Sequence, residues 1–139
     1  MAIEIASFTE ERSLPRAIAN GILCRCPNCG KGKLFRKYLK VVDSCANCGE
    51  ELKYQRADDF PPYIAIFIVG HVLVGWMLHA EMSGPVDPTF YLWTMIPLAI
   101  LMPMIMLPSI KGAVVGLQWA TRMHGFDPKR RDPAAPDTV

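Results

Sequence analysis

The chain lacks basic side chains over a long continuous stretch. Residues 57 to 110 contain no lysine and no arginine, whereas residues 10 to 57 contain ten. This asymmetry is more informative than the overall apolar content of 51%, because it divides the chain into a basic N-terminal part and an apolar part that follows. At 139 residues the chain has the length of one domain, or of a very small domain joined to another element.

Motifs that carry common enzymatic chemistry are also missing. The sequence shows no Ser, His and Asp arrangement, no phosphate-binding loop and no closely spaced pair of carboxylates. It therefore does not predict an enzyme. The first 21 residues contain acidic side chains and no long apolar core, so we expect no secretory signal.

The formal charge excludes a protein that binds polyanions along its whole length, because the net value is only +2. The excess is local: the segment 24–56 carries eight basic residues against Asp43, Glu50 and Glu51. An excess of this size favours a surface that bears phosphate groups.

Two stretches are long and apolar enough to cross a membrane, and the sequence predicts transmembrane helices over 62–82 and 89–108. Twenty helical residues reach about 30 Å, the thickness of one hydrocarbon core. Pro97 and Pro103 would interrupt a helix in water, but a membrane bundle can supply partners for the carbonyls that prolines leave free. A buried hairpin in a soluble protein is the alternative, and the rest of the chain is too short and too polar to cover it.

The ends of the chain complete the predicted organisation. Residues 1–23 read as a polar lead-in followed by a short amphipathic helix, and residues 125–139 as a disordered tail. Between the second span and the tail, residues 109–124 predict an amphipathic helix along the membrane interface, with Lys111, Gln118 and Arg122 on one face. The stretch GAVVG at 112–116 either permits close helix contact or contains two ordinary glycines.

Basic residues flank the predicted hairpin on both terminal sides and are absent from its connecting loop. The positive-inside rule therefore places both termini in the cytoplasm. The fold class that follows is a mainly α-helical membrane protein: a two-span transmembrane hairpin with an N-terminal cytoplasmic zinc-ribbon-like knuckle and a C-terminal interfacial helix.

The knuckle is predicted from two cysteine pairs. CPNCG at 26–30 recurs as CANCG at 45–49, and the intervening LFRKYLKVV reads as one strand that returns toward the second pair. Two C-x2-C pairs at this spacing are typical of a tetrahedral Zn²⁺ site in a ribbon over 24–56. A redox dithiol, an iron–sulfur cluster, another iron site or disulfides are the alternatives, and disulfides suit secreted chains. A segment this small cannot fold on its own apolar core, so we expect the zinc to be structural and held by Cys26, Cys29, Cys45 and Cys48.

Cys24 has no partner cysteine, because the equivalent position in the second copy of the motif is Asp43. One interpretation is a small apolar residue at the end of the preceding helix. The other is a free thiol beside Arg25 that is activated or exchanges as a ligand.

Polar side chains inside the predicted spans need partners. His71 lies near the middle of the first span, where it bonds a carbonyl freed by Pro97 or Pro103, or contacts a cofactor, a proton or a partner protein. Glu81 falls at the far membrane boundary, which favours an interfacial role. The alternation of Met102, Met104 and Met106 does not gather sulfurs on one helical face, so packing in lipid is a better explanation than copper binding.

The run CPNCGKGKLFRKYLKVVDSCANCG, followed by ADDFPPY, VGH, Glu81 and KGAVVGLQWATRMHGF, resembles the DUF983 family of small bacterial membrane proteins. The resemblance covers about residues 20–126 and implies a multi-pass protein of the bacterial inner membrane with two spans and a paired-cysteine ribbon. It also implies functional positions at Cys26, Cys29, Cys45, Cys48, Asp59, His71, Glu81 and Lys111. In alphaproteobacteria genes of this family commonly lie near those for cytochrome c oxidase subunits and assembly factors, which implies a role in aa3-type oxidase biogenesis.

Three functional hypotheses follow. The first is a non-enzymatic accessory or assembly protein that contacts membrane lipids and a membrane protein, in particular oxidase subunits or assembly factors, with the ribbon as docking surface. The second is a metal or haem handling protein that uses His71 and Cys24. The third is a membrane-tethered nucleic-acid-binding ribbon, which we do not expect because anionic headgroups beside the tether explain the same charges.

Overall fold

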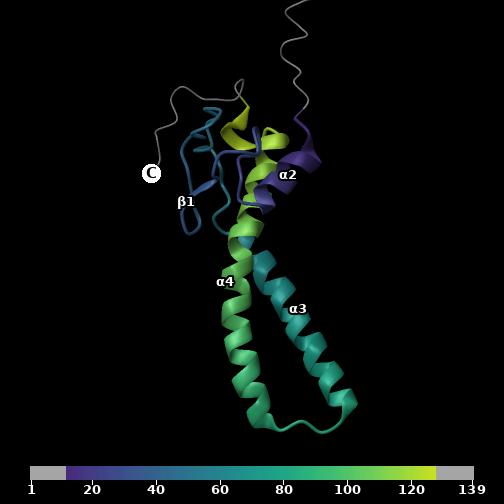
Figure 1. The fold of residues 1–139 in the computed structure, drawn as a ribbon. Coiled ribbons are helices and arrows are strands. Elements are labelled where there is room, and N and C mark those ends of the chain that lie inside the picture. Colours follow the sequence, from purple (N-terminus) through teal and green to yellow (C-terminus); the bar gives the residue numbers. More distant parts are fainter. Residues whose placement is uncertain (1–11, 128–139) are drawn as a thin grey trace, which may run out of the picture.

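The computed structural model describes residues 12–127, in which helices predominate (Figure 1). Residues 1–11 of the predicted lead-in and residues 128–139 of the predicted tail lie outside the described residues. The elements in chain order are α2 (Leu14–Ile22), β1 (Phe35–Lys37), β2 (Lys40–Val41), α3 (Phe60–Ser83), α4 (Pro88–Ala120) and the 3-10 helix η1 (His124–Phe126).

Helix α2 packs closely on the C-terminal part of α4. Gly21 meets Gly112 and Ala17 meets Gly116, and a Cβ atom added at either glycine of α4 would overlap a backbone carbonyl of α2. Small residues four apart on both helices allow this approach. Of the two readings of GAVVG, close helix contact is confirmed, and the partner is α2 of the same chain.

The ribbon contains a two-stranded antiparallel sheet where one strand was predicted. Phe35 pairs with Val41 and Lys37 with Lys40, so the chain reverses at Tyr38 and Leu39. Leu39 takes a positive φ of 59° at this reversal, and the sequence has no glycine there to signal the turn. The hairpin tip points along α4, toward the region where α3 begins (Figure 1).

Helices α3 and α4 form the two predicted apolar helices. Prolines in the first turn of α3 suit its start, and Gly84 ends it with a φ of 146°. The Asp87 side chain accepts a hydrogen bond of 2.9 Å from the Thr89 N–H at the start of α4. The two helices diverge away from the ribbon and are joined by a short loop at their far end (Figure 1).

The prediction of a break after residue 108 is wrong. Helix α4 continues through Pro97, Pro103 and Pro108 to Ala120, so the second span and the predicted interfacial helix over 109–124 are one element of 33 residues. Its last turns are buried against α2 and the ribbon instead of lying on an interface.

One contact shows how the ribbon supports this continuity. Pro108 has no N–H, so the carbonyl of Met104, four residues earlier, has no partner within the helix. The Tyr38 hydroxyl donates a hydrogen bond of 2.6 Å to that carbonyl. The hairpin tip therefore supplies the partner that the proline removes.

The core lies in the ribbon end of the molecule. Gln118, placed on a polar face by the sequence, is buried there: its amide nitrogen donates to the Arg56 carbonyl at 2.9 Å, and its oxygen accepts from the Arg56 N–H at 3.0 Å. Phe126 is also buried, so the tail predicted to be disordered from residue 125 is ordered as far as Asp127. The core residues are Ala17, Leu34, Val41, Leu52, Ala57, Val114, Val115, Trp119 and Phe126.

Both long helices expose their apolar side chains. The most apolar 18-residue window of α3 is 11% buried and that of α4 is 0% buried. A core helix of a soluble protein would be mostly buried. By length and composition, the described residues thus contain two helices capable of spanning a membrane.

Candidate metal centre

Two tight turns present the cysteine pairs. In each turn, the N–H of the glycine that follows the second cysteine donates a hydrogen bond to the carbonyl of the first cysteine. Gly30 donates to Cys26 and Gly49 donates to Cys45, both at 2.9 Å. Gly30 and Gly49 have φ values of 68° and 74°, which glycine adopts without strain. The repeated sequence of the pairs thus produces two copies of one local structure.

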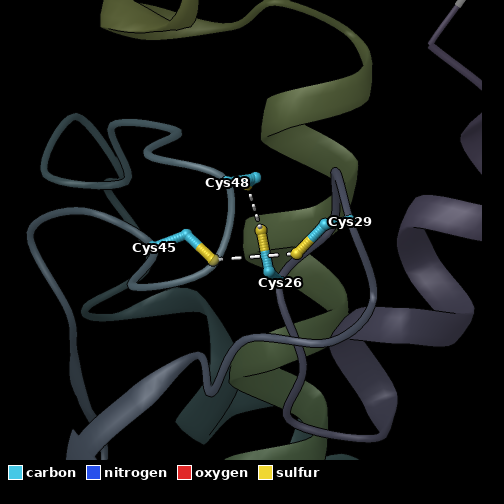
Figure 2. Close-up of side chains that lie close together, drawn as sticks. All are labelled: Cys26, Cys29, Cys45 and Cys48. Carbon is cyan, nitrogen blue, oxygen red and sulfur yellow. Dashed lines mark hydrogen bonds between the residues drawn. The ribbon is translucent and has the colours of Figure 1, made fainter.

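The four sulfur atoms gather in one cluster (Figure 2). The Sγ atoms of Cys26 and Cys48 are 3.7 Å apart, and so are those of Cys29 and Cys45. All four lie within 4.8 Å of one another. A tetrahedron with Zn–S bonds of about 2.3 Å has edges of about 3.8 Å. The four cysteines are therefore placed to hold one metal ion.

The same distances do not describe disulfides, whose sulfur atoms are about 2.05 Å apart. All five cysteines are free in the structure. Each of the two short contacts also joins one knuckle to the other, as a shared ion requires.

Gly32 is a part of the site that the sequence reasoning did not single out. Its carbonyl accepts a hydrogen bond of 2.8 Å from the Cys26 N–H, and a Cβ atom at Gly32 would overlap the Cys45 sulfur. A side chain at this position is incompatible with the cluster as it stands. The only sequence signal was a second glycine two residues after the first knuckle.

Backbone amides and burial shift the pKa values of the cysteine thiols in opposite directions. Burial raises the pKa of Cys26, and the N–H groups of Cys29 and Asn28 oppose that shift. The Gly32 N–H is the main cause that lowers the pKa of Cys29 to about 6. The positive charge of a bound metal ion would favour the thiolate form of the buried Cys26. Backbone amides already favour the thiolate form of Cys29.

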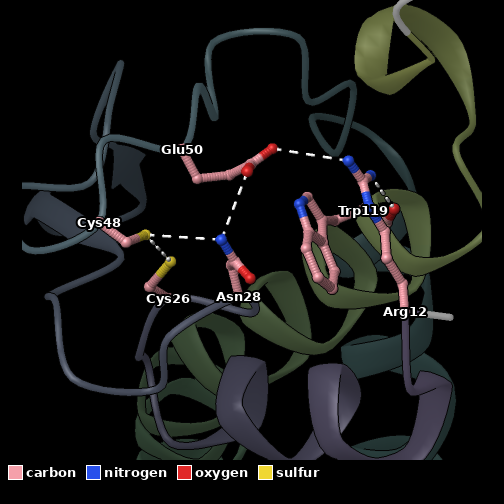
Figure 3. A network of polar contacts seen from close by, with 6 residues as sticks. All are labelled: Arg12, Cys26, Asn28, Cys48, Glu50 and Trp119. Atoms are coloured by element: carbon pink, nitrogen blue, oxygen red, sulfur yellow. Dashed lines mark hydrogen bonds and ion pairs between the residues drawn. The ribbon is translucent and has the colours of Figure 1, made fainter. Parts of the chain in front are cut away.

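A polar network leads from the cluster to helix α4 (Figure 3). The Asn28 amide donates to the Cys48 sulfur at 3.8 Å and to a Glu50 oxygen at 3.4 Å. Glu50 pairs with Arg12 at 3.8 Å, and Arg12 donates to the Trp119 carbonyl at 2.8 Å. The knuckles and the end of α4 are thereby linked through side chains as well as through the apolar core.

Cys24 lies outside the four-sulfur cluster, as the spacing predicted. It takes a positive φ of 57° just after α2 and is half-buried. Burial raises the pKa of its thiol, and a hydrogen bond with Ser109 opposes the shift. A raised pKa does not favour an activated thiol.

The remaining predicted positions are not brought together. Asp59 occupies the N-cap position of α3, and Lys111 pairs with its neighbour Asp58 at 3.6 Å. Glu81 lies at the other end of α3, where it accepts a hydrogen bond of 2.9 Å from the Tyr91 hydroxyl. The Lys111–Asp58 pair and the Tyr91–Glu81 bond join the two helices near their ends, whereas the Asp59 side chain makes no cap hydrogen bond, and these positions do not form a common site.

His71 bonds a carbonyl of its own helix. Its Nδ1 lies 2.8 Å from the Phe67 oxygen, so the predicted bond to a carbonyl freed by a proline of the partner helix is wrong. A carbonyl only accepts, so Nδ1 donates this hydrogen bond, and Nε2 is the ring nitrogen that no atom of the described residues contacts by a hydrogen bond. The imidazole lies in a shallow groove of about 500 Å³ on the outer face of α3, lined also by Ile66, Phe67, Gly70, Val74, Gly75 and Leu78.

The fold and the cluster define the class: a small, mainly helical protein that joins a four-cysteine ribbon to two long exposed apolar helices. The family model described as protein of unknown function (DUF983) matches residues 35–119, and the chain belongs to this family. The matched range contains Cys45, Cys48, His71, Glu81 and Lys111, and it begins after the first knuckle. Neither the comparison with curated proteins nor that with solved structures gives a match.

Proposed function

We propose that this chain is a non-enzymatic accessory or assembly protein of a membrane, whose ribbon is a docking surface held rigid by a structural Zn²⁺. The observation that carries the proposal is the way in which the cluster is mounted. The four cysteines sit in a ribbon that packs on the C-terminal extension of α4, and the rest of α4 is an exposed apolar helix. This arrangement suits a protein that presents a fixed surface beside a membrane.

Two features support insertion of α3 and α4 into a bilayer. Helix α3 has 24 residues and is about 36 Å long, enough to cross a hydrocarbon core. The exposed apolar surface of both helices is also far larger than a soluble monomer tolerates. Resistance of the protein to alkaline extraction from membranes tests this part of the proposal, and release as a soluble protein contradicts it.

The donor set favours Zn²⁺ in a structural role. Four thiolates occupy all four positions of a tetrahedral ion and leave none for water or substrate. Four thiolates also suit iron. Metal analysis of purified protein separates the two, because zinc gives a colourless sample and iron–thiolate centres absorb visible light.

Orientation and partner complete the proposal. The cations of residues 10–56 and the absence of cations from the loop between α3 and α4 favour termini in the cytoplasm of a bacterial inner membrane. The resemblance to its family points to aa3-type cytochrome c oxidase subunits or assembly factors as the partner. Crosslinking in native membranes followed by affinity purification should recover such subunits, and a deletion strain with normal oxidase content would remove the oxidase role.

The groove at His71 favours a second candidate, the handling of a metal or a haem. Nε2 of His71 faces an apolar groove without a hydrogen-bond partner among the described residues, and an imidazole nitrogen in such a place can bind a metal ion or a haem iron. Cys24, which lies beside Ser109 on α4, is not part of that groove. Haem or copper that co-purifies with the wild type and is lost from His71→Ala would support this candidate, and a silent variant would exclude it.

A further inference from the structure

The hairpin of the ribbon carries a concentrated positive charge. Residues 31–42 contain five cations and no carboxylate. All five are exposed, and none forms an ion pair with a carboxylate among residues 12–127. They are Lys31, Lys33, Arg36, Lys37 and Lys40.

The tip of this hairpin lies beside the apolar part of α4. The Tyr38 hydroxyl bonds the Met104 carbonyl, and Met104 precedes Lys111, the first cation of α4, by about 10 Å of helix. The tip therefore reaches past the ion pair of Lys111 with Asp58, which lies where α3 begins. Figure 1 shows the hairpin alongside α4 near the start of α3.

The chemistry of the tip fits the boundary between headgroups and hydrocarbon. Tyr38 is 57% exposed although its hydroxyl is bonded, so most of its ring faces outward, next to Leu39. Tyrosine rings are enriched at this depth of a bilayer. Lysine and arginine side chains within one or two residues of the tip are long enough to bring their charges up to the phosphate groups.

We propose that hairpin 35–41 docks the ribbon on the anionic phospholipid headgroups of the membrane that α3 and α4 span. Tyr38 and Leu39 enter the interface, and Arg36, Lys37 and Lys40 bind lipid phosphates. This inference rests on the proposed membrane insertion. It adds a lipid-binding surface that fixes the height and tilt of the ribbon above the bilayer.

A lipid surface explains the placement better than a nucleic acid does. The bond to Met104 holds the tip against an apolar helix, so the long side chains around it reach the layer between Met104 and Lys111. Within a membrane that layer is occupied by headgroups, which contribute about 1 kcal/mol of attraction for each lysine or arginine close to them.

The test uses the full-length, metal-loaded protein, reconstituted in vesicles of phosphatidylcholine alone or of phosphatidylcholine mixed with phosphatidylglycerol. Amide hydrogen exchange of the hairpin is compared between the two lipids for each variant. We expect exchange to be at least about fivefold slower in the anionic vesicles, the factor expected for one cation near an anionic surface. High salt should remove this difference because it screens the charges.

Two triple variants locate the effect. The hairpin variant should lose the difference between the lipids, and the control variant, whose cations are exposed elsewhere on the domain, should keep it. The hairpin variant is Arg36→Gln/Lys37→Gln/Lys40→Gln. The control variant is Arg16→Gln/Lys53→Gln/Arg122→Gln. Equal exchange in both lipids, or equal loss in both variants, would overturn the proposal.

Two further results separate this inference from others. Equal slowing by single-stranded RNA added to phosphatidylcholine vesicles would overturn it in favour of a general polyanion site. Failure of the protein to insert into either vesicle would overturn both the inference and the proposed membrane protein. Normal insertion with no effect of phosphatidylglycerol would overturn the inference alone.

Discussion

Gly32 illustrates how closely single residues determine the cluster. Any side chain there would overlap the Cys45 sulfur, while the Gly32 N–H and carbonyl bond Cys29 and Cys26. We predict that Gly32→Ala lowers the affinity for zinc by about 10- to 100-fold, the range measured for residues that support metal ligands. Competition with a chromophoric chelator measures the affinity. Lys33→Ala, at an exposed neighbouring position, is the control, and unchanged affinity in Gly32→Ala would show that the knuckles relax freely.

Gln118 carries a second prediction at the scale of the residue. Its side chain satisfies both backbone groups of Arg56 from within the core. Gln118→Leu leaves that N–H and carbonyl without these partners, so we expect the free energy of unfolding to fall by about 1–3 kcal/mol. Denaturant titration in detergent measures the change. Gln118→Glu, when ionised, buries a negative charge against the Arg56 carbonyl, so it should be no more stable than Gln118→Leu. Equal stability of the wild type and Gln118→Leu would contradict this role.

Between elements, the contact of α2 with α4 depends on the absence of side chains. Gly112 faces the Gly21 carbonyl too closely for a Cβ atom. Gly112→Ala should push α2 and α4 apart and lower the free energy of unfolding of the ribbon domain by about 1–3 kcal/mol. Thermal unfolding followed by tryptophan fluorescence measures this effect, because Trp119 lies in the same interface.

Gly70→Ala is the matched control for that substitution. Gly70 also lies in a helix, but no atom lies within 4 Å of the place of a Cβ atom there. Alanine favours a helix over glycine, so this variant should be as stable as the wild type or more stable. If both variants were equally stable, the close approach of α2 and α4 would not matter for folding.

At the scale of the elements, the sequence predicted the helices and turns that depend only on the pattern of neighbouring residues. Apolar runs indicated α3 and the first part of α4, and two copies of C-x2-C-G indicated the knuckles. Both signals reside in neighbouring residues, so they need no knowledge of the tertiary structure.

Features that depend on distant partners could not be predicted in the same way. Pro108 read as a helix end because nothing near it indicates that Tyr38 supplies the missing donor. Gln118 read as a polar surface residue because its partner is the backbone of Arg56, far away in the sequence. The continuity of α4 and the burial of its last turns depend on such contacts between distant residues.

At the scale of the whole molecule, the metal centre and the apolar helices are mechanically joined. The knuckles connect to α4 through Asn28, Glu50 and Arg12, and the hairpin connects to it through Tyr38. Loss of the metal should loosen the ribbon and these links to α4, while α3 and α4, which contain none of the four cysteines, should stay helical. We predict that chelation increases cleavage by trypsin within residues 31–56 without loss of membrane association. Loss of the protein from the membrane on chelation would contradict this separation.

The central claim is that four cysteines of one chain hold one metal ion. Native mass spectrometry of the full-length protein extracted from membranes tests it most directly. The account predicts the mass of one chain with one zinc ion in place of two protons, and loss of the ion from Cys45→Ser but not from Cys24→Ser. A chain without metal, in which Cys26, Cys29, Cys45 and Cys48 are joined as disulfides, would contradict it.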